Sequence, residues 1–300
     1  MILKLGMRES MIQLAGRPFQ LNGMWPADNI EDVIIQRMQE DPTVYSYSSI
    51  DELAFELKLR KNIIASARAM NQGHAQFQPF ATSRCNPDYW HLTSTGGFQL
   101  RYDVTPAEGI QDIYKNSSLY AFECATAKVI IYYHAVLNSI GEYLFNRFFQ
   151  NLHLYSWHFD SDLGIQTTYT DYFLPGDVVY FNNPDFNPET PWWRGENAVV
   201  LEDGTYFGHG LGIKTAEQMI NLLNRQRAPW GNQSAYLSNS VTRLSFKHLA
   251  RLSMTRTDNM ACKIPHVVIL HNQSSISFNH YWFYLHHFYT QITNSPPFPS

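Results

Sequence analysis

The chain has 300 residues and a formal net charge of −4, and 16% of its residues are charged, against about 25% in an ordinary soluble chain. Apolar residues make up 44% and aromatic residues 15%, which excludes a disordered chain and is ample for a large core. A weakly acidic chain also lacks the positive charge expected of a nucleic-acid binder.

The first half of the chain is predicted to be mainly helical. A capping box at Ser49–Glu52 begins a helix whose apolar residues continue at helical spacing until Gly73. Residues 89–92 and 98–102 flank a Ser-Thr-Gly-Gly turn, which predicts a β-hairpin. Pro106 is then expected to begin a short helix.

The longest helical pattern starts at Ser117 or Ser118 and continues to Phe149. It is apolar on more than one face, which is typical of a buried helix. Short β-like runs follow at 152–155, 166–173, 178–181, 198–201 and 205–207, and a helix returns over 214–225. We therefore predict an α+β fold in which an antiparallel sheet packs on a central helix.

Residues 261–300 form a different kind of sequence. They contain one charged side chain, Lys263, and five of the twelve histidines: His266, His271, His280, His286 and His287. These histidines lack a compact ligand spacing, so we expect solvated aromatic and histidine side chains rather than a metal site.

The cysteines Cys85, Cys124 and Cys262 are too few for a disulfide scaffold. Charged residues between positions 4 and 17 interrupt any apolar leader, and no uncharged apolar run reaches the roughly 18 residues of a spanning helix. We expect a soluble intracellular protein in a reducing compartment, with no membrane contact.

Cys124 is the strongest candidate nucleophile because it falls in the first two turns of the predicted central helix. A helix N-terminus stabilises a thiolate and offers N–H groups to a developing oxyanion. Taken alone, a buried free cysteine is more often a small core residue. Cys85, in a polar loop, and Cys262, in the atypical C-terminal part, have no helix start beside them.

A carboxylate and an imidazole are predicted to share one sheet face. Asp203-Gly204 between alternating apolar residues predicts a two-residue hairpin turn. That register places Ala198 opposite His209 and leaves Glu196 diagonal to His209, at about 7–8 Å. Each of the two side chains, considered separately, is more commonly an ordinary surface residue.

Three segments carry a family resemblance: residues 119–133 around Cys124, Trp193–Asn197, and His209–Gly212. They resemble the bacterial spore-coat transglutaminases, which are protein-glutamine γ-glutamyltransferases of endospore formers. The resemblance extends from about residue 20 to 255. It implies a papain-like fold of the NlpC/P60 type, with an N-terminal extension over 1–19, one catalytic domain over 20–255 and an atypical C-terminal extension over 256–300.

The resemblance also implies a set of catalytic residues. Cys124 would be the nucleophile and Glu196 its acid–base partner, with Glu123 as a second carboxylate for the same role and His209 as an orienting residue. Two anions side by side repel each other, so we expect the resting Cys–Glu pair to share a proton.

Substrate contacts follow from the same match. Trp157 and Trp193 would form walls that shield a thioester from water, and Asn197 would contact the substrate. The implied reaction joins protein Gln and Lys side chains without cofactor, metal or calcium; Asp185–Glu189 lacks the Gly and final Glu of a calcium loop.

The expected substrates are spore coat proteins, acted on by a monomer in the mother-cell cytoplasm and later in the spore coat. Two alternatives remain: a cysteine amidase or peptidase of the same fold, which would hydrolyse amides, and a non-catalytic structural protein of the coat.

Overall fold

The computed structural model describes residues 11–19, 30–255 and 267–294, so Cys262, Lys263 and His266 lie outside the described residues. The helices are α1 (Ile30–Glu40), α2 (Ile50–Gln72), α3 (Pro106–Lys115), α4 (Cys124–Ile140), α5 (Glu142–Phe148), α6 (Ala216–Asn224), α7 (Phe246–Ser253) and α8 (Phe278–Asn294). The strands are β1 (Ile12–Leu14), β2 (Arg17–Pro18), β3 (Tyr45–Tyr47), β4 (Gln76–Phe77), β5 (Trp90–Leu92), β6 (Phe98–Leu100), β7 (Ala121–Phe122), β8 (His153–Leu154), β9 (Gln166–Tyr169), β10 (Val178–Asn182), β11 (Gly195–Val200), β12 (Tyr206–Gly208), β13 (Gly212–Lys214) and β14 (Tyr236–Arg243). Short 3-10 helices are η1 (Phe80–Thr82), η2 (Ser117–Leu119), η3 (Ser161–Leu163) and η4 (Pro191–Trp193).

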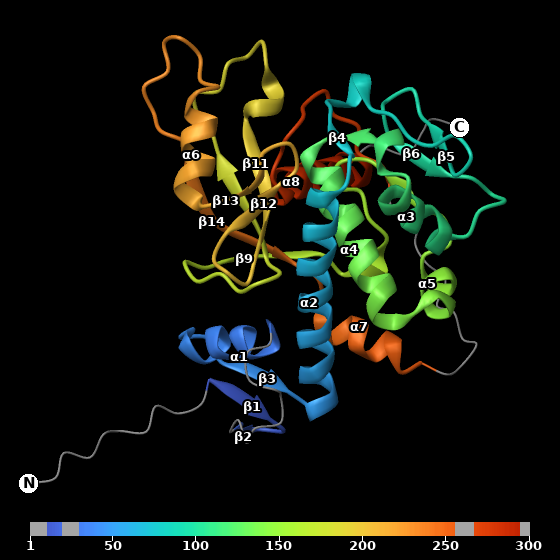
Figure 1. The fold of residues 1–300 in the computed structure, drawn as a ribbon, viewed down its shortest axis with the longest axis vertical. Coiled ribbons are helices and arrows are strands. Elements are labelled where there is room, and N and C mark those ends of the chain that lie inside the picture. The colour runs from blue at the N-terminus through green and yellow to red at the C-terminus, as the bar shows by residue number, and fades with distance from the viewer. Residues whose placement is uncertain (1–10, 20–29, 256–266, 295–300) are drawn as a thin grey trace, which may run out of the picture.

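The centre of the molecule is a pair of helices against a sheet. Helices α2 and α4 lie side by side, with the six-stranded sheet on one side of them and α3, β5 and β6 on the other (Figure 1). The sheet order is β13-β12-β11-β10-β14-β9, and its neighbouring strands are all antiparallel. Helix α4 packs on β11, so the predicted α+β arrangement of a sheet on a central helix is found.

Several local signals act as predicted. The Ser49 side chain accepts a hydrogen bond from the backbone N–H of Glu52 and begins α2, which ends before Gly73. The predicted hairpin forms from β5 and β6. Pro106 is the first residue of α3, whose start is stabilised by a capping box between Thr105 and Glu108.

The long helix predicted from Ser117 or Ser118 to Phe149 is wrong at both ends. Residues 117–119 form η2, and β7 then pairs in parallel with β4, so α4 begins only at Cys124. At the other end the chain turns at Gly141, whose φ is +84°, and resumes as α5. The apolar pattern looks continuous in the sequence because buried helix and buried strand residues are alike over short runs.

A buried ionic cluster joins α2 to the sheet. Arg60 donates to Glu56 and to Asp177, at 2.9 Å in each case, and Arg243 of β14 donates to both oxygens of Asp177. Arg60 and Asp177 are almost completely buried. The cluster holds the loop before β10 against the middle of α2. It thereby fixes the position of the sheet relative to the α2–α4 pair.

Residues 267–294, the C-terminal segment, contribute buried side chains to the core, contrary to the expectation of solvated side chains. Ile276, Phe278 and Tyr281 are buried and belong to the main core cluster, whereas His286 and His287 are exposed. Apolar residues at 278, 281 and 285 give the start of α8 one buried face, and Ile276 is buried just before it. In the described part of the chain, no helix has the length and apolar character needed to cross a membrane.

Candidate active site

Cys124 is the first residue of α4, which places its thiol at the helix N-terminus. Residue 123 is the N-cap, and its extended backbone, imposed by β7, turns into the helix one residue later. The thiol is completely buried, on the side of α4 that faces the sheet through β11. The position is closer to the positive end of the helix dipole than the sequence predicted.

Glu123 acts as the cap of that helix. One carboxylate oxygen accepts from the backbone N–H of Ala125 at 2.7 Å, and the other accepts from the N–H and hydroxyl of Thr126 at 2.6 and 2.8 Å. Burial raises the pKa of Glu123, and these hydrogen bonds oppose the rise. The carboxylate lies beside Cys124, as expected, but both of its oxygens are engaged in positioning the helix start.

Glu196 is a buried carboxyl group with an unengaged oxygen. It lies on the central strand β11, paired with Phe181 of β10, and is 1% exposed. Burial raises its pKa to about 8; Lys128 opposes this rise and Glu123 adds to it. Its Oε1 atom has no hydrogen-bond partner among the described residues. Such a group exchanges protons near neutral pH and can bond to an incoming ligand.

The thiol and the two carboxyl groups are electrostatically coupled. Burial raises the pKa of Cys124 well above its usual value, and the charges of Glu196 and Glu123 raise it further. The Asn197 side chain donates to Cys124 Sγ at 3.3 Å, which favours the thiolate. At rest the thiol therefore holds its proton until a base removes it.

The hairpin that brings Glu196 near His209 has a different register from the predicted one. Ala198 pairs with Gly208 and Val200 with Tyr206, one residue away from the expected pairing. The loop has three residues, closed by a hydrogen bond from the Leu201 N–H to Thr205, with Gly204 at a φ of +79°. A type I turn followed by a left-handed Gly produces this geometry, and Asp-Gly occurs in it as well as in two-residue turns.

As a consequence, the backbone N–H of His209, rather than its ring, bonds to the Glu196 carboxyl group. The imidazole stacks on Phe122 with the ring centroids 4.6 Å apart, and its Nε2 atom is 3.1 Å from the carbonyl oxygen of Gln76. Burial lowers the pKa of His209 to about 3, so the ring is neutral. It connects the end of β12 to β4 and β7, beside the start of α4.

Lys128 belongs to the site, although the sequence did not indicate it. It is one helical turn after Cys124, completely buried, and its Nζ donates to the carbonyl oxygen of Phe207 at 3.3 Å. Burial lowers its pKa, while Glu196, Cys124 and Glu123 oppose that shift. A lysine four residues after a candidate nucleophile, within a helix that is apolar on more than one face, was the available signal.

The tryptophans implied by the resemblance lie in different surroundings. Trp157 is completely buried, and its ring N–H donates to the carbonyl oxygen of Ile276 at 2.9 Å. Trp193 of η4 is partly buried and stacks on Phe77, with centroids 6.0 Å apart. The contact between Trp157 and Ile276 involves the C-terminal segment, which the sequence did not place near the site.

Cys85 lacks these surroundings. It is half-buried, and burial raises its pKa to about 11. Its Sγ atom lies 3.8 Å from the carbonyl oxygen of Trp90. In the described residues, Cys124 is thus the cysteine that combines a helix N-terminus with neighbouring carboxyl groups; no cluster of three or more His, Cys, Asp or Glu side chains there suits a metal ion.

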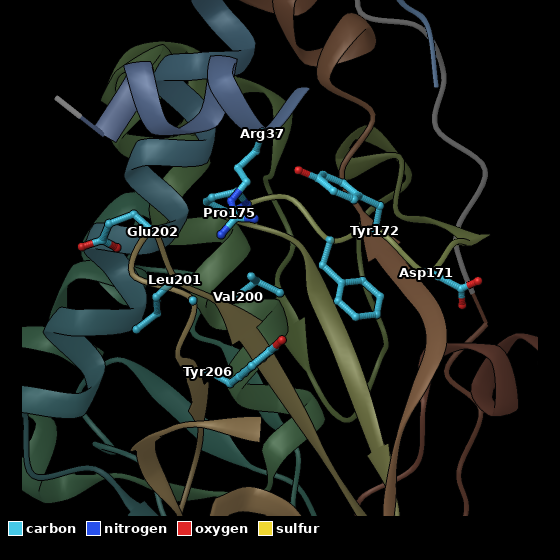
Figure 2. A pocket seen from close by; sticks show the side chains of 10 residues that line it. Arg37, Asp171, Tyr172, Pro175, Val200, Leu201, Glu202 and Tyr206 are labelled. Carbon is cyan, nitrogen blue, oxygen red and sulfur yellow. The ribbon is translucent and has the colours of Figure 1, made fainter. Parts of the chain in front are cut away.

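A separate cavity of about 310 Å³ lies away from the thiol. Arg37 extends into it from α1, and Val200 and Tyr206 of the β11–β12 hairpin lie opposite (Figure 2). Cys124, Glu196 and Asn197 are not among its lining residues. The reactive groups are thus not in this open cavity.

Comparison with known proteins gives consistent matches. The family model described as protein-glutamine gamma-glutamyltransferase matches residues 11–253. A protein of that name from Halalkalibacterium halodurans is 53% identical over 279 residues, 93% of this chain and 98% of the relative. One from Bacillus mycoides is 44% identical over 240 residues, 80% of this chain and 87% of the relative.

A solved structure is also similar. It is described as a transglutaminase from Geobacillus stearothermophilus without C-terminal extension, and it is 48% identical, with a TM-score of 0.66, over 69% of this chain and 100% of that chain. The match to the Halalkalibacterium halodurans protein spans 279 residues, more than the 266 that precede residues 267–294, so it includes part of that C-terminal segment.

Proposed function

This chain belongs to the protein-glutamine gamma-glutamyltransferase family, and we propose that it transfers the γ-glutamyl group of protein Gln through a thioester on Cys124, with Glu196 as acid and base. The activity is that of an acyltransferase. The observation that carries the assignment of residues is the buried thiol at the start of α4, hydrogen-bonded by Asn197 and coupled to Glu196, whose Oε1 is unengaged among the described residues.

Acylation begins with a proton transfer. Ionised Glu196 takes the proton of the Cys124 thiol, and the resulting thiolate attacks the γ-carboxamide carbon of Gln. Glu196 then gives that proton to the departing nitrogen, so that ammonia leaves and a thioester remains. Lys128 lies within electrostatic reach of Glu196 and the thiol and stabilises the negative charge that they share.

Transfer to the second substrate reverses the proton path. The neutral ε-amine of a Lys attacks the thioester carbon, and Glu196 removes the amine proton as the C–S bond breaks. The isopeptide leaves, and the proton returns to the Cys124 sulfur. One Gln and one Lys thus yield one isopeptide and one ammonia, and no cofactor, metal or calcium ion takes part.

The remaining expected residues have supporting roles. We assign Trp157, Trp193 and Asn197 to substrate contact and to the exclusion of water, which favours transfer over hydrolysis of the thioester. Glu123 keeps the helix start in place, and His209 orients the β12 end beside Glu196. The enzyme acts as a monomer with a papain-like catalytic core over residues 20–255.

The substrates proposed are spore coat proteins, in the mother cell and then in the coat. This proposal rests on the resemblance of three segments to the spore-coat members of the family. It is tested by mass spectrometry of coat extracts from strains with and without the gene, in which Gln–Lys crosslinks should be lost with the gene. Equal crosslinking in both strains would exclude these substrates.

The chemistry is tested by incorporation of a fluorescent alkyl amine into a Gln-bearing protein, with EDTA present. The wild-type chain and Cys85→Ala should label the protein, and Cys124→Ala should not. Label incorporation by Cys124→Ala would overturn the assignment. Release of ammonia without amine incorporation would instead favour a hydrolase, the second candidate.

A further inference from the structure

Two side-chain N–H groups, one of which also contacts the thiol, donate to the same backbone oxygen of the C-terminal segment. The carbonyl oxygen of Ile276 accepts from Asn197 Nδ2 and from Trp157 Nε1, at 2.9 Å in both cases. Asn197 also donates to Cys124 Sγ. An amide carbonyl held by two donors beside a nucleophilic sulfur has the arrangement expected of a bound substrate carboxamide.

The preceding residue, Ser275, is also held against residues of the site. Its carbonyl oxygen accepts from the Tyr180 hydroxyl at 2.7 Å. Its own buried hydroxyl has no hydrogen-bond partner among the described residues, but it is close enough to Cys124 to lower the pKa of the thiol. Ser275 is completely buried and has a φ of +58°, which is uncommon for a residue other than Gly. The backbone is therefore held in an unfavourable conformation at the point of contact.

The segment is anchored on both sides of this contact. Before it, His271 pairs with Ser156 at 2.9 Å, and the Tyr155 hydroxyl donates to the His271 carbonyl oxygen. After it, Phe278 packs edge-on against Trp157, with centroids 5.4 Å apart, and Asn279 donates to Ser240. Through Asn279, the start of α8 is attached to β14 of the sheet (Figure 1).

Catalysis requires access that this arrangement denies. Cys124 and Trp157 are 0% exposed and Glu196 is 1% exposed. A Gln carboxamide can accept hydrogen bonds from Asn197 and Trp157 only if Ile276 moves, because the Ile276 carbonyl oxygen already occupies both donors. The segment is not confined to this chain, since the match to the Halalkalibacterium halodurans protein includes part of it.

We propose that residues 267–294 are an autoinhibitory segment, whose Ile276 carbonyl occupies the position of the substrate carboxamide between Asn197 and Trp157. The enzyme is inactive while the segment is docked, so the activity of the wild-type chain is that of the small fraction of molecules in which the segment is displaced. This inference rests on the proposed function, because it takes Cys124 as the nucleophile. The charge-poor composition of residues 261–300 fits a segment whose side chains pack into the hydrophobic core.

The test uses full-length chains and the alkylation of Cys124 by iodoacetamide, followed by peptide mass spectrometry. Phe278→Ala removes the anchor on Trp157, and Asn279→Ala removes the anchor on Ser240 without touching the active site. Phe283→Ala is the control, since Phe283 is on the same helix and 64% exposed. Alkylation of Cys124 should rise about tenfold or more in the first two variants and stay unchanged in the control.

Amine incorporation, measured on the same samples, should rise in parallel. Three results would overturn the inference: rapid alkylation of Cys124 in the wild-type chain, no change in both Phe278→Ala and Asn279→Ala, or faster alkylation without faster amine incorporation. If circular dichroism shows that Phe278→Ala does not fold, the alkylation rates of Asn279→Ala and of the wild-type chain test the inference instead. Alkylation needs no catalysis, so these outcomes are separate from the test of Cys124→Ala.

Discussion

The carboxyl group of Glu196 occupies the space beside Gly208 that a side chain there would need. A Cβ atom at residue 208 would lie 2.8 Å from Glu196 Cγ and 3.0 Å from Oε1. The one-residue difference in hairpin register is what places Gly208, rather than His209, opposite Ala198. A residue without a side chain thus gives the proton-transferring group its position.

Gly208→Ala should therefore displace the Glu196 carboxyl group. We expect a loss of about 1–3 kcal/mol in the free energy of unfolding, from overpacking. Because about 1 Å of misplacement can cost on the order of 100-fold in rate, amine incorporation should fall by a similar factor in the folded fraction. Urea denaturation and kcat measurements test this. A fully active variant would show that the site tolerates movement of Glu196.

Glu196→Gln should change how stability depends on pH. The folded-state pKa of Glu196, about 8, is above its ordinary value of 4.5. Between these values the folded chain binds the proton more tightly than the unfolded chain, so wild-type stability decreases as pH rises from about 5 to 8. The Gln variant lacks this decrease. The free energy of unfolding of the Gln variant, relative to that of wild type, should increase by up to about 1.4 kcal/mol per pH unit in that window.

Urea titrations of both proteins, at several pH values from about 5 to 8, measure this difference. Other titrating groups are common to both chains and cancel in the comparison. A constant difference across the window would mean that Glu196 keeps an ordinary pKa, and that burial does not prepare it for proton transfer.

Lys128→Met should shift the pH dependence of the reaction. Glu196 must be ionised to take the thiol proton, so kcat/KM should rise with pH through about 8. The Lys128 charge lowers the pKa of Glu196, and its removal should move this rise to higher pH. At a fixed pH below the rise, kcat/KM should fall about tenfold for each pH unit by which the profile moves.

Lys61→Met is the matched control, because Lys61 is a 42% exposed lysine that pairs with Glu31. Its pH profile should follow that of the wild-type chain. An unchanged profile in Lys128→Met would show that the buried lysine serves packing alone, through its contacts with Phe207.

Local signals in the sequence predicted much of the fold. The Ser49 cap, the Gly-Gly hairpin and Pro106 act through hydrogen bonds or backbone limits within a few residues, so they could be recognised without the tertiary structure. The start of the central helix could not be located this way, because β7 exists only through its pairing with the distant β4.

In the candidate active site too, some residues could be predicted from the sequence, whereas others depend on tertiary contacts. The resemblance pointed to Cys124 and Glu196, and the structure places them within electrostatic reach of each other. The contact of Ile276 with Asn197 joins residues 79 positions apart and follows no local pattern. The unusual composition of the C-terminal segment suggested solvated side chains, yet its scarcity of charge is a property that burial favours.

The ionic cluster of Asp177 with Arg60 and Arg243 supports the last prediction. Burial would raise the pKa of Asp177, but the two guanidinium groups outweigh it and lower the pKa. Asp177→Asn leaves both arginines without this charge partner, so we expect a loss of about 3–5 kcal/mol in the free energy of unfolding.

Because the folded-state pKa is lowered, the contribution of Asp177 is present above the unfolded pKa and is lost as pH falls below it. The difference in the free energy of unfolding between wild type and Asp177→Asn should therefore be largest near neutral pH. It should decrease when the urea titrations are repeated at acidic pH. Asp103→Asn is the control: Asp103 pairs with Arg101 at the surface, where an ion pair contributes little, so its unfolding curve should match wild type. If the two variants unfold alike near neutral pH, the cluster does not hold α2 against the sheet.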